Sequence, residues 1–245
     1  MERFPHRSSH FTAFIFSPQK CNKTGFGKGA PMSFLSSVRC KEKPISTRKQ
    51  VLHTVAIAFL GITLGAFSKF LDTTAANALP FLFQYLDLTN FLGRFAIWTL
   101  LGICISIYSN SAMRASINVF VFFLAMVGSY YLYSKLVAGF FPKSYAMIWF
   151  AFTAISPLLA FLCWYAKGKS SVSNVLSAII IAVLFNMTFV YGWFYFAMRS
   201  ILELLVFIVG LIVLKRDTIK ATIIMAASAI VLAVFLDLLI PFHFG

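Results

Sequence analysis

The stretch that decides the fold is residues 172–214, VSNVLSAIIIAVLFNMTFVYGWFYFAMRSILELLVFIVGLIVL, in which Arg199 and Glu203 are the two charged residues. A helix needs about 20 apolar residues to cross about 30 Å of hydrocarbon. This stretch is therefore about twice as long as one crossing requires. The interruption from Gly192 to Arg199 divides it, and the pattern predicts two transmembrane spans, 173–191 and 198–214.

Apolar stretches of similar length lie on both sides of this segment. Ser-, Asn-, Gly-, Pro- and Lys-containing connections separate them, and their order predicts five further spans, at about 51–70, 91–108, 115–137, 145–165 and 219–240. We therefore expect an all-α polytopic transmembrane helix bundle of about seven spans over residues 51–245, with no soluble domain. If 172–214 contains a re-entrant hairpin, or if 91–108 lies in the interface, the count becomes six or five.

The composition excludes several classes of protein. The chain has 245 residues, of which 60% are hydrophobic and 11% are charged, whereas soluble domains are about half apolar and a quarter charged. An ordinary cytosolic enzyme, a nucleic-acid-binding domain and a secreted disulfide scaffold are excluded on this ground. The net charge of +14 is better explained by attraction to anionic lipid and by the excess of Lys and Arg in cytoplasmic segments of membrane proteins than by binding to nucleic acid.

Residues 1–50 hold 10 of the 21 Lys and Arg residues and no long apolar run. We expect them to form a disordered, basic, cytoplasmic tail. Two alternatives stay open: the shortage of acids together with many Ser, Arg and Lys is typical of an organellar targeting segment, and Met32 is a second candidate for the start of translation. The basic tail places the amino terminus inside the cell, because short cytoplasmic segments are rich in Lys and Arg.

Charged side chains inside or beside the predicted spans gather toward one membrane face. An ionisable group at the centre of a span costs about 2.5 to 3.5 kcal/mol on insertion scales, so it needs a partner, a water-filled cavity or the interface. Under the seven-span topology the ionisable groups share the outer side, and six of them are candidate ligand-binding residues: Lys69, Asp72, Arg94, Arg199, Glu203 and Asp237.

Two interpretations fit this outer cluster. In the first, the charges and nearby tyrosines and tryptophans line an outward-facing polar vestibule for a small ligand. In the second, they form an ordinary aromatic belt in which Lys and Arg reach the interface without binding anything. Glu203 and Asp237 fit the second interpretation less well. Each lies several residues inside its span, and a short acidic side chain cannot reach the interface from there. Arg199 or Arg94 is the expected counter-charge.

Four residues are expected to serve helix packing. Gly61 and Gly65 have the small-residue spacing that lets two helices approach closely. Pro157 near the middle of its span predicts a kink. Asn186, beyond the middle of its span, is expected to hydrogen-bond a neighbouring helix or, in the alternative, to line a path.

The common catalytic motifs do not occur. The chain has no HExxH, no GxSxG and no Walker lysine loop, and Cys104 and Cys163 have no CxxC or Cys/His spacing. We therefore expect no enzyme activity, no bound cofactor and no metal site.

Several short phrases resemble a family of small, uncharacterised multi-pass membrane proteins from bacteria, chiefly Gram-positive ones. They are Ser68–Asp72, Asn118–Phe120 followed by Tyr130–Tyr133, Gly139–Pro142, and Ser156-Pro157 followed by Trp164–Gly168. The similarity covers about residues 51–170. It implies a location in the bacterial cytoplasmic membrane and no established activity.

These observations favour one function and leave one alternative. The favoured function is a permease-like or small-ligand-binding membrane protein with an outward-facing polar vestibule. The alternative is a non-catalytic membrane partner or assembly factor, with Gly61 and Gly65 as its docking face. The expected partners are the lipid bilayer and either a small molecule or another membrane protein, with no nucleic acid.

Overall fold

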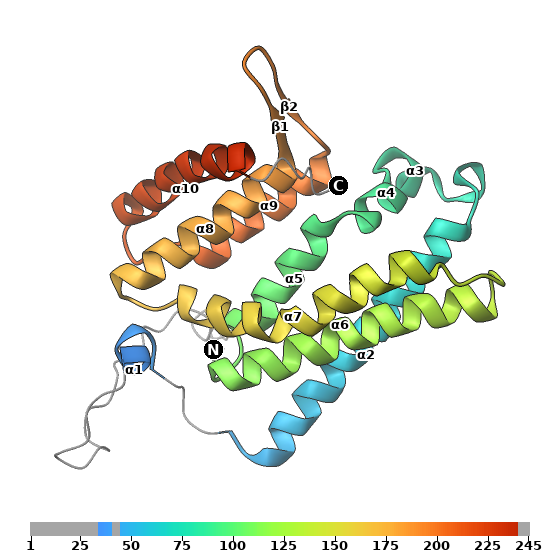
Figure 1. The fold of residues 1–245 in the computed structure, drawn as a ribbon, viewed down its shortest axis with the longest axis horizontal. Helices are drawn as coiled ribbons and strands as arrows, with labels where there is room; N and C mark the ends of the chain where they lie inside the picture. Colours follow the sequence, from blue (N-terminus) through green and yellow to red (C-terminus); the bar gives the residue numbers. More distant parts are fainter. Residues whose placement is uncertain (1–33, 41–44, 240–245) are drawn as a thin grey trace, which may run out of the picture. The chain divides into compact units, whose positions relative to one another are not determined.

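The computed structural model describes residues 34–40 and 45–239, and in them the all-α prediction is confirmed (Figure 1). The helices follow one another through short connections, with one small hairpin between two of them. The elements are α1 (Phe34–Val38), α2 (Thr47–Thr73), η2 (Ala76–Ala78), α3 (Phe81–Tyr85), α4 (Leu88–Gly93), α5 (Phe95–Ile107), α6 (Ala112–Leu136), α7 (Lys143–Ala166), α8 (Ser171–Thr188), β1 (Phe189–Tyr191), β2 (Phe196–Met198), α9 (Ile201–Leu214) and α10 (Ile219–Leu239).

Within residues 34–40 and 45–239, five helices are long and apolar enough to cross a membrane: α2, α6, α7, α8 and α10. The other two predicted spans appear as the shorter helices α5 and α9, of 13 and 14 residues. At 1.5 Å per residue each extends about 20 Å, which is less than the hydrocarbon thickness. The structure therefore supports a membrane protein with five candidate spans.

Local backbone geometry explains why these two helices are short. Arg94 is extended, with φ −95° and ψ 164°, and separates α4 from α5 inside the predicted span 91–108. Before α9, a hairpin of β1 and β2 contains residues at the end of the predicted span 173–191 and at the start of the predicted span 198–214. Its aromatic and β-branched residues favour extended backbone.

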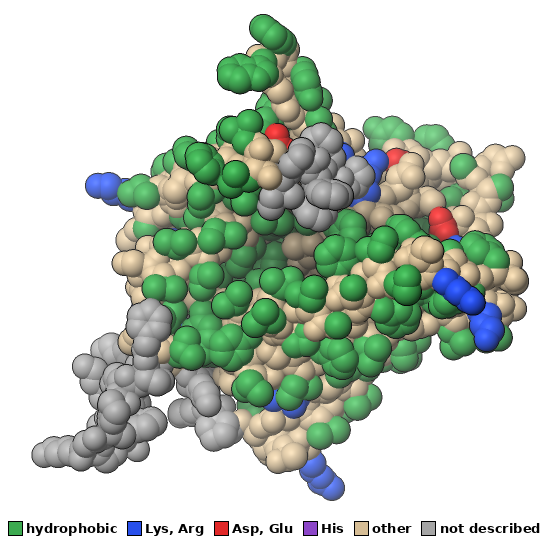
Figure 2. Space-filling view, viewed as in Figure 1, with side chains coloured by type: hydrophobic (Ala, Val, Ile, Leu, Met, Phe, Trp, Pro, Cys, Tyr) green, Lys and Arg blue, Asp and Glu red, His purple; other side chains and the backbone are tan. Residues whose placement is uncertain are grey.

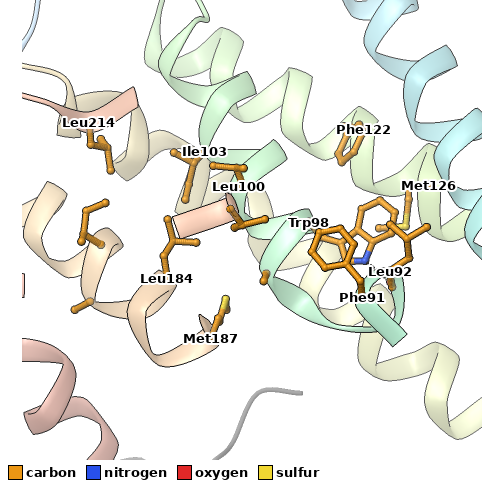
Figure 3. Close-up of a cluster of buried hydrophobic side chains, with 14 of the residues drawn as sticks. Phe91, Leu92, Trp98, Leu100, Ile103, Phe122, Met126, Leu184, Met187 and Leu214 are labelled. Carbon is orange, nitrogen blue, oxygen red and sulfur yellow. Dashed lines mark hydrogen bonds between the residues drawn. The ribbon is translucent and has the colours of Figure 1, made fainter. Parts of the chain in front are cut away.

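Helix α5 is the central helix of the described fold. It contacts α6, α7, α8 and α9, and seven of its residues are buried. Figure 3 shows Leu100 and Ile103 of α5 on the side of Leu184 in α8 and Leu214 in α9, while Trp98 lies beside Met126 of α6. Because its neighbours are protein rather than lipid, α5 has no need to match the thickness of the bilayer.

Helices α2 and α6 approach closely at two glycines. A Cβ atom on Gly61 would lie 2.5 Å from the carbonyl oxygen of Phe122, and one on Gly65 would lie 2.1 Å from that of Met126. Either position would clash with the backbone, so any larger residue would push the helices apart. The small-residue face of α2 is thus occupied by α6 of the same chain.

Helix α7 continues through Pro157. Proline has no N–H, so the carbonyl of Thr153, four residues earlier, loses its usual helical donor. The hydroxyl of Ser156 donates to that carbonyl at 2.8 Å, and the hydroxyl of Ser116 in α6 donates to the carbonyl of Pro157 at 2.8 Å. Neighbouring side chains therefore satisfy the backbone around the proline.

Residues 34–40 lie in the segment predicted to be a disordered tail, yet they have a defined place on the bundle. The guanidinium of Arg39 donates to the carbonyls of Ile107 and Trp164, at 3.0 and 2.7 Å. It also lies 4.3 Å from the centre of the Trp164 ring. Arg39 thereby joins the carboxyl ends of α5 and α7. The prediction for residues 1–33 and 41–44 lies outside the described residues.

Candidate functional site

The structure places four of the six predicted ligand-binding residues in two ion pairs. Lys69 and Asp72 pair at the end of α2, and Arg94 pairs with Glu203 between α4–α5 and α9. Asp237 is half-buried in α10, and Arg199 is half-buried just before α9. Lys69 with Asp72 and Arg94 with Glu203 are thus two separate ion pairs.

The first contact joins α2 to α6. The ammonium nitrogen of Lys69 lies 2.6 Å from Asp72 Oδ2, and Lys69 is only 4% exposed. Its nitrogen also lies 5.0 Å from the ring centre of Tyr130 and 4.9 Å from that of Phe140. The hydroxyl of Tyr130 donates to Asp72 Oδ2 at 3.0 Å. A carboxylate and two ring faces thus stabilise this ammonium group.

A cavity of about 50 Å³ lies beside this contact. It is large enough for a few water molecules or a small molecule. Asp72 and five aromatic side chains form much of its wall, and none of the described residues that line it is basic. The lining residues are Ser68, Asp72, Thr89, Leu92, Gly93, Trp98, Met126, Val127, Tyr130, Tyr131, Tyr145 and Trp149.

Tyr131 is the unusual member of this wall. It is 3% exposed, and its buried hydroxyl has no hydrogen-bond partner within residues 34–40 and 45–239. The indole N–H of the neighbouring Trp98, by contrast, donates to the carbonyl of Leu92 at 2.8 Å. An unsatisfied buried polar group costs about 1–3 kcal/mol, so a hydroxyl kept in this position needs an explanation.

The second contact is more deeply buried. Arg94 Nη1 lies 3.0 Å from Glu203 Oε1; Glu203 is fully buried, and Arg94 is 26% exposed. Of the two cations expected to pair with Glu203, the structure places Arg94 on it, 109 positions earlier in the chain. The second oxygen, Oε2, has no hydrogen-bond partner among the residues that the structure describes.

The start of α9 holds Glu203 in place. Ser200 caps the helix, and its hydroxyl accepts a hydrogen bond from the backbone N–H of Glu203 at 3.3 Å. The hydroxyl of Thr188, the last residue of α8, donates to the Glu203 carbonyl at 3.1 Å. The first turn of α9 is therefore tied to the end of α8, and the carboxylate is directed at the break between α4 and α5.

Asn186 serves contacts between helices. Its amide nitrogen donates to the carbonyl of Ala233 in α10 at 2.9 Å, and its amide oxygen accepts from the hydroxyl of Tyr191 at 2.9 Å. Asp237 lies one turn beyond Ala233 on the same helix. These bonds join α8, α10 and the hairpin.

The opposite end of the bundle is held by cations that donate to backbone carbonyls. Arg216 donates to the carbonyls of Gly168 and Ala166 at the end of α7, at 2.9 and 3.2 Å. Lys167 donates to the carbonyls of Val213 and Lys215 at the end of α9. Burial, and after it the charges of nearby cations, of which Arg216 contributes most, lower the pKa of Lys167 to about 8. These side chains act on the negative ends of helix dipoles.

A second cavity, of about 220 Å³, lies among the short elements η2, α3 and α4. Asp87 lines it and has the left-handed backbone conformation, with φ 49°. Asn90 donates to both oxygens of the Asp87 carboxylate, at 2.8 and 3.0 Å. The Asp87 carboxylate is thus hydrogen-bonded to a residue three positions later in the chain. In the described part of the chain no group of three His, Cys, Asp or Glu side chains is placed to hold a metal ion.

Comparison of the chain with protein-family models, with curated proteins and with solved structures finds no match.

Sequence reasoning named Tyr131 as an aromatic residue at the outer level without distinguishing it from its neighbours. No sequence signal marks a tyrosine whose hydroxyl is unsatisfied, because that property depends on which groups four helices bring around it. The pairing of Arg94 with Glu203 also has no sequence signal. Arg199, four residues before Glu203, has the helical spacing that favours an ion pair.

Proposed function

We propose that the chain is a multi-pass integral membrane protein that binds a small polar ligand at its outer end and acts in a permease-like manner. The proposal is supported by the five long apolar helices and by the cavity beside Asp72. Figure 2 shows that hydrophobic side chains cover much of the visible face, with the charged side chains mainly toward its edges.

The proposal includes seven membrane crossings, of which two are made by short helices. Helix α5 is surrounded by protein, and α4 precedes it with only Arg94 between them. Helix α9 runs from the outer level of Glu203 to Leu214 beside the end of α7, where Lys167 reaches its last carbonyls. Both helices thus connect the two ends of the bundle.

The orientation in the proposal has the amino terminus inside a bacterial cytoplasmic membrane. One end of the bundle carries basic side chains, among them Arg39, Arg114, Lys167 and Arg216, which bind helix carbonyls there. The positive-inside rule assigns this end to the cytoplasm. The cavity and the Arg94–Glu203 pair then face outward.

The buried hydroxyl of Tyr131, which has no hydrogen-bond partner among the described residues, is the observation that carries the ligand site. A ligand in the cavity would give this hydroxyl a partner, and its other groups would meet Asp72 and the aromatic ring faces. A small neutral or cationic molecule with hydrogen-bonding groups suits such a wall better than an anion does. The volume of about 50 Å³ limits the ligand to a few non-hydrogen atoms.

The alternative role is that of a non-catalytic membrane partner or assembly factor, with Gly61 and Gly65 as its docking face. Both glycines face α6 of the same chain. A partner would need another surface.

The substitution Tyr131→Phe tests the ligand site. In the absence of ligand the variant should melt at the same temperature as the parent or higher, because it removes an unsatisfied buried hydroxyl. It should also lose the rise in melting temperature that a bound ligand produces. The measurement is thermal melting in detergent with methylammonium, acetamide, glycine and acetate as probes.

Tyr130→Phe is the matched control, since it removes a hydroxyl that is bonded to Asp72 and should lower the melting temperature without ligand. The ligand site is rejected if none of the four probes stabilises the parent more than Tyr131→Phe.

A further inference from the structure

The hairpin of residues 189–198 is the strongest feature that the proposed ligand site does not use. Its sequence, FVYGWFYFAM, contains six aromatic residues and no charge. Phe189 pairs with Met198, Val190 with Ala197 and Tyr191 with Phe196 in an antiparallel register. The hairpin begins directly after α8 and ends two residues before α9. It therefore lies at the ends of two helices and at the outer level of the bundle.

The base of the hairpin is fixed to the bundle. The Phe189 ring stacks on Phe196 with centres 5.1 Å apart, and it contacts Phe185 and Phe207 at 4.7 and 5.6 Å. The hydroxyl of Tyr191 donates to Asn186. The position of the hairpin is thus set by α8 and α9.

The tip is ordered as a turn but is not covered. The backbone N–H of Gly192 donates to the carbonyl of Tyr195 at 2.9 Å, and a Cβ on Gly192 would lie 2.6 Å from the Tyr195 ring. Trp193 is 95% exposed and Phe194 is 101% exposed. Figure 2 shows hydrophobic side chains of the hairpin projecting from the bundle. Such large apolar groups are unfavourable in water.

The direction of the hairpin indicates where the tip lies. Figure 1 shows β1 and β2 turned aside from the axes of α8 and α9 rather than continuing along them. When the helices cross a membrane, a hairpin turned in this way extends over the lipid at the membrane surface instead of projecting into the water.

The backbone limits how deep the hairpin can lie. A two-stranded hairpin has outer edges whose N–H and C=O groups are unpaired within the sheet, and such edges are not tolerated in the hydrocarbon core. Tryptophan and tyrosine, in turn, are enriched at the boundary between headgroups and acyl chains. The unpaired backbone groups and the aromatic rings are therefore both accommodated at the membrane interface.

We propose that the 189–198 hairpin is an interfacial anchor, whose Trp193 and Phe194 lie in the headgroup–acyl boundary of the outer leaflet. The occupant of the exposed tip is lipid, because the hairpin presents aromatic rings without any charged group and lies at the level where the spans end. The inference rests on the membrane location in the proposed function but is independent of the ligand site.

Tryptophan fluorescence of the full chain in phosphatidylcholine vesicles tests this anchor. The other tryptophans, Trp98, Trp149 and Trp164, are kept, and the emission of Trp193 is obtained as the difference between the parent and Trp193→Phe. We expect a blue-shifted difference spectrum that aqueous iodide does not quench. Lipids brominated near the headgroup end of the acyl chain should quench it more than lipids brominated near the terminal methyl.

Two failures are distinguishable. Resistance of the protein to alkaline carbonate extraction tests membrane integration, so extraction into the aqueous phase would reject the membrane location in the proposed function and the anchor with it. An integrated protein whose Trp193 emission is quenched by iodide and unaffected by brominated lipid would overturn the anchor alone. That outcome would assign the tip to water or to a protein partner.

Discussion

At the scale of single residues, Glu203 makes the most consequential contact outside the cavity. It is fully buried and its charge is balanced by Arg94, so Glu203→Gln leaves a partly buried cation without its partner. Breaking a buried pair costs about 3–5 kcal/mol, against about 0.2–1 kcal/mol for an exposed pair. Because Arg94 is 26% exposed, we expect a loss between these limits, measured by thermal melting in detergent.

The double variant Arg94→Gln with Glu203→Gln should recover part of this loss, since neither charge is then left alone. The matched control replaces Arg199, the cation with the better sequence spacing, together with Glu203. Recovery with Arg199→Gln instead of Arg94→Gln would contradict the pairing that the structure shows.

At the scale of one helix, the hydrogen bonds around Pro157 make a prediction about α7. Ser156→Ala leaves the carbonyl of Thr153 without the donor that replaces the missing proline N–H. It should therefore lower stability by about 1 kcal/mol. In a Pro157→Ala background the helix N–H is restored, and the same Ser156→Ala change should have little effect.

The control for α7 is Thr63→Ala on α2. Its hydroxyl donates to the carbonyl of Phe59 at an exposed site, where no proline removes the backbone donor. Equal losses from Ser156→Ala with and without Pro157 in a double-mutant cycle would show that Ser156 does not compensate for the proline.

Segment 34–40 makes a second prediction at this scale. Deletion of residues before Met32 should leave membrane insertion and accumulation unchanged, because Arg39 and four other basic residues remain before Val51. Arg39→Ala, by contrast, removes the donor to the ends of α5 and α7 and should lower the melting temperature. Loss of membrane localisation after the deletion alone would support the targeting role for the tail.

At the scale of the whole molecule, the testable property is topology. Reporters fused after Arg114, Lys169 and Arg216 should score cytoplasmic, and those after Thr74, Lys143 and Gly245 should score external. Arg114 distinguishes the alternatives most sharply, because it follows the short helix α5. If α5 does not cross, Arg114 lies on the same side as Thr74. An external score at Lys169 would reject the proposed orientation.

The sequence by itself determined the helical class, the apolar segments and the place where the segment 172–214 is interrupted. These properties follow from local composition, since the length and hydrophobicity of a run are readable without knowing its neighbours. The lengths of α5 and α9 were not predicted. A helix buried among other helices does not have to span the hydrocarbon by itself, and only the packing shows which helix is central.

The tertiary structure decided which polar groups meet. Lys69 and Asp72 are three residues apart, and their pairing follows from helical spacing. The pairing of Arg94 with Glu203 depends on helices that are distant in sequence. So does the position of Tyr131 at a cavity, with no partner for its hydroxyl in the part of the chain that the structure describes. Composition sets the solvent in which the chain folds, but the contacts of the candidate site arise from the way in which α4, α6, α7, α8 and α9 pack around α5.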